Sequence, residues 1–253
     1  MIKKIFRSES DLYNLSFKRT NVLHQGVNLD YKKIVVNKPW GYEYLLFEND
    51  RVAIWILCLK KDSGTSMHCH PNKKTSLTVL SGQAVTSTLD TQFLLNAMDG
   101  LFIDSGVFHS TRSASDGETF LMEIETPPNK NDLVRLKDQY GRENKTYEGQ
   151  NFMSDKLADY NYCDLHFKAP KGKYSEERNL VGKNLKVVRG SFDDIVREHI
   201  TDDDNVHICL LEGNLTGHNG ELILDAGESV TSEFIKNLNG NVKPTDCHML
   251  IIY

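Results

Sequence analysis

Short apolar and β-branched runs, separated by Gly, Asp, Asn and Ser, follow one another along the first half of the chain. We predict strands at residues 34–36, 42–47, 52–59, 76–80, 84–89, 93–95, 101–103 and 120–126. Turn residues such as Asn49-Asp50, Ser81-Gly82 and Asp99-Gly100 end several of these runs. Strands at this spacing favour a sandwich or barrel over alternating βαβ units.

The second half repeats this pattern more weakly, after a stretch of polar residues. Strands are predicted at 184–188, 206–211, 221–224 and 248–253, with a short helix at 191–199 capped by Ser191. Leu211-Glu212-Gly213 echoes Leu80-Ser81-Gly82, which favours two related barrels. The predicted organisation is an N-terminal arm (1–30), a metal-binding barrel (31–142), a connector (143–179) and a degenerate barrel without a metal motif (180–253).

Two histidines one residue apart form the motif with most chemical content. Because alternate side chains of a strand share a face, His68 and His70 should point the same way, and Cys69 should point away as a structural thiol. His109 follows on a later segment, after Ser105-Gly106. Three imidazoles that converge from two strands would bind a divalent transition metal.

Around these histidines the chain resembles the cupin superfamily. Gly64, His68, His70 and Gly82 match the first cupin motif, and Gly106 to His109 match the Gly-x-x-His of the second motif, although Asp104 stands in place of its proline. The resemblance implies an all-β fold, here with two double-stranded β-helix (cupin) barrels, the second degenerate. Since cupins commonly pair through their sheets, it also implies a homodimer.

A narrower resemblance covers residues 35 to 142. Lys38-Pro39-Trp40-Gly41, Ile124-Glu125-Thr126 and residues 132–142 look like the flanks of the type II mannose-6-phosphate isomerase domain, often fused to mannose-1-phosphate guanylyltransferase. This resemblance implies cytoplasmic chemistry on a sugar phosphate or nucleotide sugar, typically for a bacterial surface polysaccharide.

Thr75 departs from the cupin pattern, because it stands where the family has a glutamate ligand. A site of three histidines plus water or substrate could still polarise an oxygen as a Lewis acid, with Zn, Fe, Ni or Mn as the metal. It could also hold ferrous iron, as three-histidine cupin oxygenases do. The third alternative is that metal binding has decayed.

Five further residues are candidates for the chemistry. Lys73 stands where the isomerase pattern has a basic residue, and Lys74 and Arg112 could bind phosphate. Trp40 could stack on a sugar ring, or form a structural corner with its neighbours. Glu125 would be a general base if its face of the strand lines the barrel. The apolar opposite face favours a solvent-facing Glu125, unless that face packs against the second barrel.

The composition mainly serves to exclude classes of partner and of location. With 30 basic and 35 acidic residues the net charge is −5, and no basic stripe indicates a nucleic-acid partner. No run approaches the ~20 apolar residues needed to span a bilayer, and no secretory signal follows the basic N-terminus, so we expect neither membrane association nor secretion. Five scattered cysteines then indicate reduced thiols in the cytoplasm.

These observations favour a metal-dependent enzyme that isomerises or epimerises a sugar phosphate or nucleotide sugar. Glu125 and Lys73 are the predicted catalytic residues, Arg112, Lys74 and Trp40 the predicted substrate contacts, and the three histidines the predicted metal ligands. The alternatives are a three-histidine ferrous oxygenase and a non-catalytic sugar-binding protein with two cupin barrels.

Overall fold

A computed structural model describes the chain except residues 1, 19–28, 144–149, 166–173, 201–205 and 239. Strands dominate it, as predicted. The first sheet has eight strands, in the spatial order β1 (Ile2–Ile5), β9 (Gly100–Ile103), β6 (Lys74–Ser81), β11 (Thr119–Thr126), β4 (Ala53–Leu59), β3 (Gly41–Glu48), β2 (Val35–Lys38) and β13 (Met153–Ser154).

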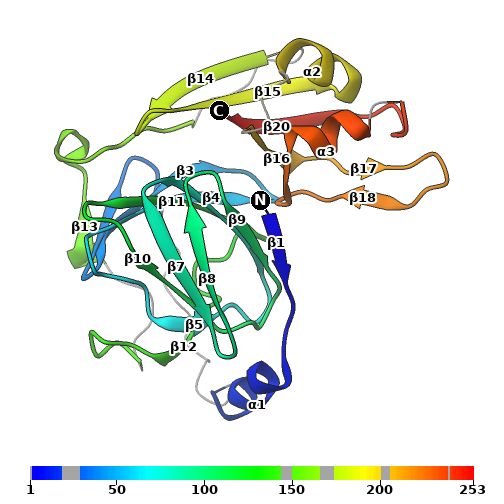
Figure 1. Cartoon of the computed structure of the whole chain (residues 1–253). Coiled ribbons are helices and arrows are strands. Elements are labelled where there is room, and N and C mark those ends of the chain that lie inside the picture. Colours follow the sequence, from blue (N-terminus) through cyan, green and yellow to red (C-terminus); the bar gives the residue numbers. More distant parts are fainter. Residues whose placement is uncertain (1, 19–28, 144–149, 166–173, 201–205, 239) are drawn as a thin grey trace.

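A second sheet faces the first and closes the N-terminal barrel (Figure 1). Its strands, in order, are β12 (Val134–Lys137), β5 (Met67–Cys69), β10 (His109–Ser113), β7 (Gln83–Thr88) and β8 (Gln92–Asn96). The chain passes from β6 to β7 at Gly82, whose φ is +83°. A Cβ there would lie 2.6 Å from Oγ of Ser115, so both the backbone and the space require glycine.

The first sheet is apolar on both faces. Leu57, Leu77 and Leu121 point into the barrel. Phe120, Met122 and Ile124 point outward and pack against the C-terminal part of the chain, where their core neighbours include Leu185, Val187, Leu250 and Ile252. Because β11 is covered on both sides, its outer face is not exposed to solvent. Glu123 and Glu125 share the inner face with Leu121 and therefore point into the barrel.

The C-terminal part forms one five-stranded sheet and a hairpin. The sheet runs β14 (Tyr174–Leu180), β15 (Lys183–Ser191), β20 (Asp246–Ile252), β16 (His207–Glu212) and β19 (Ser229–Thr231), and the hairpin joins β17 (Leu215–Thr216) to β18 (Leu222–Leu224). One sheet face packs on the barrel, while α2 (Phe192–His199) and α3 (Ser232–Asn237) cover the other. A second barrel is therefore not confirmed: this sheet covers the first barrel instead of enclosing a core with a partner sheet.

The predicted helix with its Ser191 cap is confirmed. Helix α2 begins after Ser191, whose side chain accepts a hydrogen bond from the backbone N–H of Asp194. The segment predicted as a connector contains β13 and two 3₁₀ turns, η2 (Gln150–Phe152) and η3 (Leu157–Asp159), and packs against the barrel through Tyr160 and Tyr162. Strand β14 begins inside this segment.

The N-terminal arm is fixed to the barrel close to the third histidine. Strand β1 pairs in parallel with β9, and α1 (Glu9–Lys18) follows it. The buried carboxylate of Asp11 accepts a hydrogen bond from the backbone N–H of Phe108 at 2.8 Å, and Arg7 donates to the carbonyl of Ser105 at 2.9 Å. The arm thus helps to hold the loop that leads into His109.

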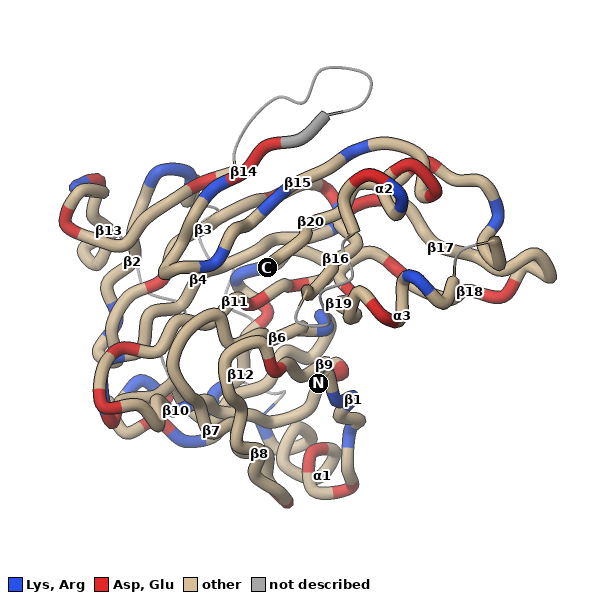
Figure 2. The backbone as a smooth tube through the Cα atoms, turned by 45° about the horizontal axis from the view of Figure 1, so that its top comes forward, with Lys and Arg blue, Asp and Glu red and all other residues tan. Residues whose placement is uncertain are grey.

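Charged residues of both signs are interspersed along the chain, and acidic residues outnumber basic ones on α2 (Figure 2). Among the described residues, no helix has the length and apolar character that crossing a membrane requires.

Candidate metal centre

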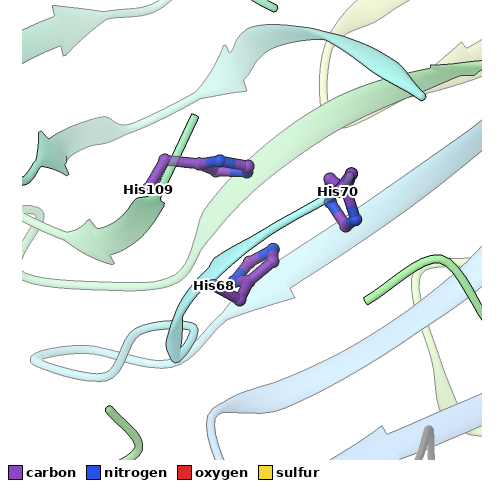
Figure 3. A group of neighbouring side chains, drawn as sticks. All are labelled: His68, His70 and His109. Atoms are coloured by element: carbon purple, nitrogen blue, oxygen red, sulfur yellow. The ribbon is translucent and has the colours of Figure 1, made fainter. Parts of the chain in front are cut away.

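Three histidines from two strands meet inside the barrel. His68 lies on β5 directly opposite His109 on β10, and His70 follows β5 by one residue. One ring nitrogen from each histidine lies within 4.8 Å of the others, and Figure 3 shows the three rings turned toward a common point. Cys69 points the other way, as predicted, into an apolar cluster with Leu15, Phe108 and Val134.

Hydrogen bonds leave the same nitrogen available on each ring. Nδ1 donates to a backbone carbonyl in every case: that of Ser66 at 2.8 Å for His68, that of Asp132 at 2.7 Å for His70, and that of Val107 at 3.0 Å for His109. Nε2 of His70 and His109 is buried without a hydrogen bond to the described residues. Carbonyl acceptors that fix the tautomer in this way are typical around metal-binding histidines, so the site fits a divalent transition metal.

Burial also keeps these rings neutral. It lowers the pKa of His68 and His70 well below the usual 6.5 and the pKa of His109 to about 4, and the nearby charge of Lys73 adds to the effect on all three. A neutral imidazole is the form that binds a metal. The arrangement of the three rings and their protonation state therefore both suit metal binding.

The metal-free protein should lose stability on acidification. A histidine with a folded pKa near 4 and an unfolded pKa near 6.5 binds its proton mainly in the unfolded state between these values, so unfolding becomes easier as pH falls. Such a histidine costs about 2 kcal/mol at pH 5 relative to pH 7. His207 and His248, also with pKa values of about 4, act in the same direction, whereas Glu123, with a pKa raised to about 7, opposes them.

We expect the free energy of unfolding, measured by urea denaturation with a chelator present, to be at least about 2 kcal/mol lower at pH 5 than at pH 7. His248→Gln should reduce this difference, while the exposed His218→Gln should not. Equal stability at the two pH values would contradict buried neutral histidines.

No carboxylate of the described residues joins the three-histidine group. Thr75 points into the barrel, and its buried hydroxyl makes no hydrogen bond to the described residues. Glu125 lies directly opposite Thr75 on the neighbouring strand β11. The carboxylate of Glu125 therefore lies beside Thr75, on the strand next to the position that holds the acidic ligand in the cupin motif.

A network of buried ion pairs adjoins the histidines. Nζ of Lys73 lies 2.6 Å from Oε1 of Glu125, and both side chains are only 1% exposed. Nζ of Lys130 lies 3.0 Å from Oε1 of Glu43 and 3.5 Å from that of Glu125, and 3.6 Å from the centre of the Trp55 ring. Lys38 pairs with Glu43 at 3.5 Å.

This network corrects one expectation from the sequence. A solvent-facing Glu125 was favoured, yet Glu123 and Glu125 both point into the barrel and are buried. The reason is the exception already stated: the apolar face of β11 packs outward, against the C-terminal sheet. Lys73 is correspondingly buried and does not lie on a solvated loop.

A cavity of about 60 Å³ connects His68 and His70 with these charges. Three predicted residues besides His68 and His70 line it, namely Trp40, Lys73 and Glu125. Its charged lining, among the residues that the structure describes, comprises five cations and three carboxyls: Lys38, Lys73, Lys130, Arg135 and Arg142, with Glu43, Glu123 and Glu125. The excess of cations favours an anionic ligand.

Two predicted substrate contacts lie elsewhere. Arg112 is exposed, because alternation along β10 turns His109 and Thr111 inward and Arg112 outward, beside Gly64. Lys74 is exposed for the same reason on β6, with its Nζ 5.9 Å from the centre of the Phe102 ring. Neither residue lines the histidine cavity.

Sequence reasoning missed several residues of the cavity. Arg135 was not among the predicted site residues, but it lies opposite His68 on β12 and is 6% exposed. Arg142 lines the same cavity and is held by Asp138, with Nη2 and Oδ1 2.8 Å apart. The alternation of Val134, Arg135 and Leu136 places Arg135 on the opposite face from its neighbours. It would have pointed to the cavity only if the pairing of β12 with β5 had been known.

The turn after β11 ties the network to the histidines. Asp132 accepts hydrogen bonds from the backbone N–H groups of Asn72 and Lys73, while its carbonyl holds His70. The carbonyl of Asn129 accepts from Nζ of Lys73 at 3.1 Å. Residues 129–132 therefore position a histidine ring, a lysine and, through Lys130, two glutamates at once.

Comparisons with known proteins agree with this picture for part of the chain. No protein-family model matches it. A stretch of 128 residues, 49% of the chain, is 27% identical to a mannose-1-phosphate guanylyltransferase of Klebsiella pneumoniae and 26% identical to one of Escherichia coli. The match covers 27% of each of these proteins, so the chain spans about a quarter of their length. Both relatives are mannose-1-phosphate guanylyltransferases, the class of protein that the sequence resemblance pointed to, so the resemblance is confirmed for part of the chain.

Solved structures resemble the chain over shorter stretches. The capsular polysaccharide assembling protein CapF of Staphylococcus aureus covers 41% of this chain and 34% of its own, with 16% identity and a TM-score of 0.38. A sugar phosphate isomerase of the cupin superfamily from Silicibacter pomeroyi covers 37% and 64%, with 12% identity and a TM-score of 0.34.

Proposed function

We propose that this protein is a metal-dependent enzyme that isomerises or epimerises a sugar phosphate or nucleotide sugar. The observation that carries the proposal is a group of three neutral imidazoles, of which His68 and His70 line a cation-rich cavity together with the buried Lys73–Glu125 pair. His68, His70 and His109 would hold the metal through Nε2. When bound, it supplies a Lewis acid that polarises a substrate oxygen.

The charges of the cavity suit an anionic substrate. Five lysine and arginine side chains against three carboxyls leave positive charge for a phosphate or an enolate-like oxygen. Arg135 and Arg142 can offer paired N–H groups, which match the geometry of phosphate. Lys73 can stabilise negative charge that develops during the reaction, while a glutamate on the inner face of β11 moves the proton. Glu125, the residue predicted from the sequence, is one such glutamate.

The size of the cavity limits what can lie beside the histidines. About 60 Å³ holds a small polar group but not a whole hexose phosphate. A second cavity of about 570 Å³ shares Glu125 and Lys130 with the first and is otherwise lined mainly by polar groups, such as Asn129 and Asn131. We infer that a polar end of the substrate enters the first cavity, while the second, whose lining includes Asp30 and Glu48, can hold sugar hydroxyl groups.

Interconversion of mannose 6-phosphate and fructose 6-phosphate is the first reaction to test. The metal-loaded protein is incubated with either sugar in D₂O, and conversion and deuterium incorporation at C1 and C2 are followed by NMR. We expect turnover that a chelator abolishes and that is restored by one of Zn, Fe, Ni or Mn. Binding of the sugars without any exchange, extended to other hexose phosphates and nucleotide sugars, would contradict an enzyme and support the non-catalytic alternative.

A ferrous oxygenase is the second candidate, because the ligand group contains three histidines and no carboxylate among the described residues. It would show oxygen uptake only with iron. Oxygen electrode measurements on the iron-loaded protein, with and without sugar substrates, decide between the two reactions.

A further inference from the structure

We propose that Glu123, and not Glu125, is the side chain that carries the proton in the reaction. This inference rests on the proposed isomerase function and assigns a residue role within it. Both glutamates point into the barrel from β11, but their surroundings differ in a way that decides which of them can give and take a proton.

The three glutamates of the cavity differ in their partners. Glu43 pairs with Lys38 and Lys130, and Glu125 pairs with Lys73 and Lys130. Glu123 makes no ion pair and no hydrogen bond with the described residues, although it lines the cavity together with His68 and His70. It is therefore the carboxyl that a substrate can reach without breaking a buried ion pair.

The pairing in the sheet places Glu123 between two apolar neighbours. Trp55 on β4 lies on one side and Leu77 on β6 on the other, and both point into the barrel core. In these surroundings burial raises the pKa of Glu123 to about 7, in spite of Lys130 and Lys73, whose charges lower it, while Glu125 and Glu43 raise it further. The charges of Lys73 and Lys130 overcome burial at Glu125, whose pKa is lowered.

A carboxyl with this property suits both halves of an isomerisation. As carboxylate, Glu123 would accept the proton from the carbon next to the carbonyl, while the C–H electron pair forms the C=C bond of an enediolate and the carbonyl electrons move to its oxygen. As acid, it would return the proton to the neighbouring carbon. One proton also leaves the second hydroxyl and one is gained at the first oxygen, so no other reactant is consumed. A group near its pKa can serve in both directions at neutral pH.

The test compares Glu123→Gln, Glu125→Gln and the exposed control Glu118→Gln in the zinc-loaded protein. Solvent deuterium incorporation into hexose 6-phosphate, zinc affinity and the free energy of unfolding are measured for each. We expect Glu123→Gln to lower deuterium exchange at least about 100-fold, the usual contribution of a general acid–base, with zinc affinity and stability close to those of the wild type. Glu125→Gln should mainly lower stability, and Glu118→Gln should change nothing.

The outcomes separate this inference from the proposed function. If the wild type exchanges deuterium and Glu123→Gln exchanges it as fast, Glu123 does not carry the proton and the inference is overturned. If Glu123→Gln lowers zinc affinity more than about tenfold, Glu123 is a metal ligand instead, which also overturns it. If the wild type exchanges with none of the sugars, the proposed function itself has failed. The pH profile of the wild-type exchange rate should show a group with a pKa near 7. Loss or displacement of that pKa in Glu123→Asp supports the inference.

Discussion

Replacing His70 by alanine should reduce zinc affinity by at least about 100-fold and abolish turnover with hexose phosphates. The ring is positioned at both ends: Nδ1 is held by the carbonyl of Asp132, and Nε2 is buried beside His68 and His109 without a hydrogen bond to the described residues. Two imidazoles cannot replace a set of three. Isothermal titration with zinc and metal analysis after dialysis, on protein without a histidine tag, measure the loss.

His109→Ala is the matched variant from the other strand, and the exposed His218→Ala is the control. The first should lose zinc as His70→Ala does, because both rings contribute to one site. The second should bind zinc like the wild type. Unchanged affinity in both site variants, with folding verified by circular dichroism, would rule out a metal centre at these histidines.

The histidine site was predictable because its geometry is local. Strand alternation alone places His68 and His70 on one face and Cys69 on the other, and the glycine before His109 indicates the turn that brings the third ring back. The same rule separates Lys73 from Lys74 only when the strand and its faces are known. Without that knowledge Lys74 and Arg112 remained candidates for binding a phosphate.

The charge network could not be predicted, because its members come from separate strands and a turn. Glu43 on β3 and Lys130 after β11 are 3.0 Å apart in space and far apart in sequence. The direction of Glu125 depended on a contact between the two halves of the chain, in which Ile124 packs on the C-terminal sheet. A pattern with one apolar and one charged face normally indicates solvent on the charged side, and only a covering sheet reverses that interpretation.

The weak echo between the two halves was a correct observation of local structure, but the two related barrels that it favoured are not confirmed. Leu211-Glu212-Gly213 does end a strand, as Leu80-Ser81-Gly82 does, and both glycines have positive φ. Nevertheless, the described C-terminal strands form one main sheet, because helices α2 and α3 cover the face that a second sheet would need. Turn signals are local, whereas closure of a barrel depends on what covers each face.

Lys73→Met should lower the free energy of unfolding of the metal-free protein by about 3 kcal/mol at pH 7, because it leaves Glu125 buried without its 2.6 Å partner. Lys130, 3.5 Å away, offsets only part of this loss. The difference should shrink as pH falls. The wild-type pair lowers the pKa of Glu125, so its stabilisation is present above the unfolded pKa near 4.5 and is lost on acidification through the lower folded value.

Two further variants make this measurement specific. Lys74→Met, the exposed neighbour, should change stability by less than about 0.5 kcal/mol, since its side chain lies outside the barrel. Lys73→Met combined with Glu125→Gln should recover most of the loss, because a neutral glutamine does not need the cation that Lys73→Met removes. Urea denaturation of all three at pH 7 and pH 4 tests the pair directly. A Lys73→Met protein as stable as the wild type at pH 7 would mean that the buried Lys73–Glu125 pair makes no net contribution to stability.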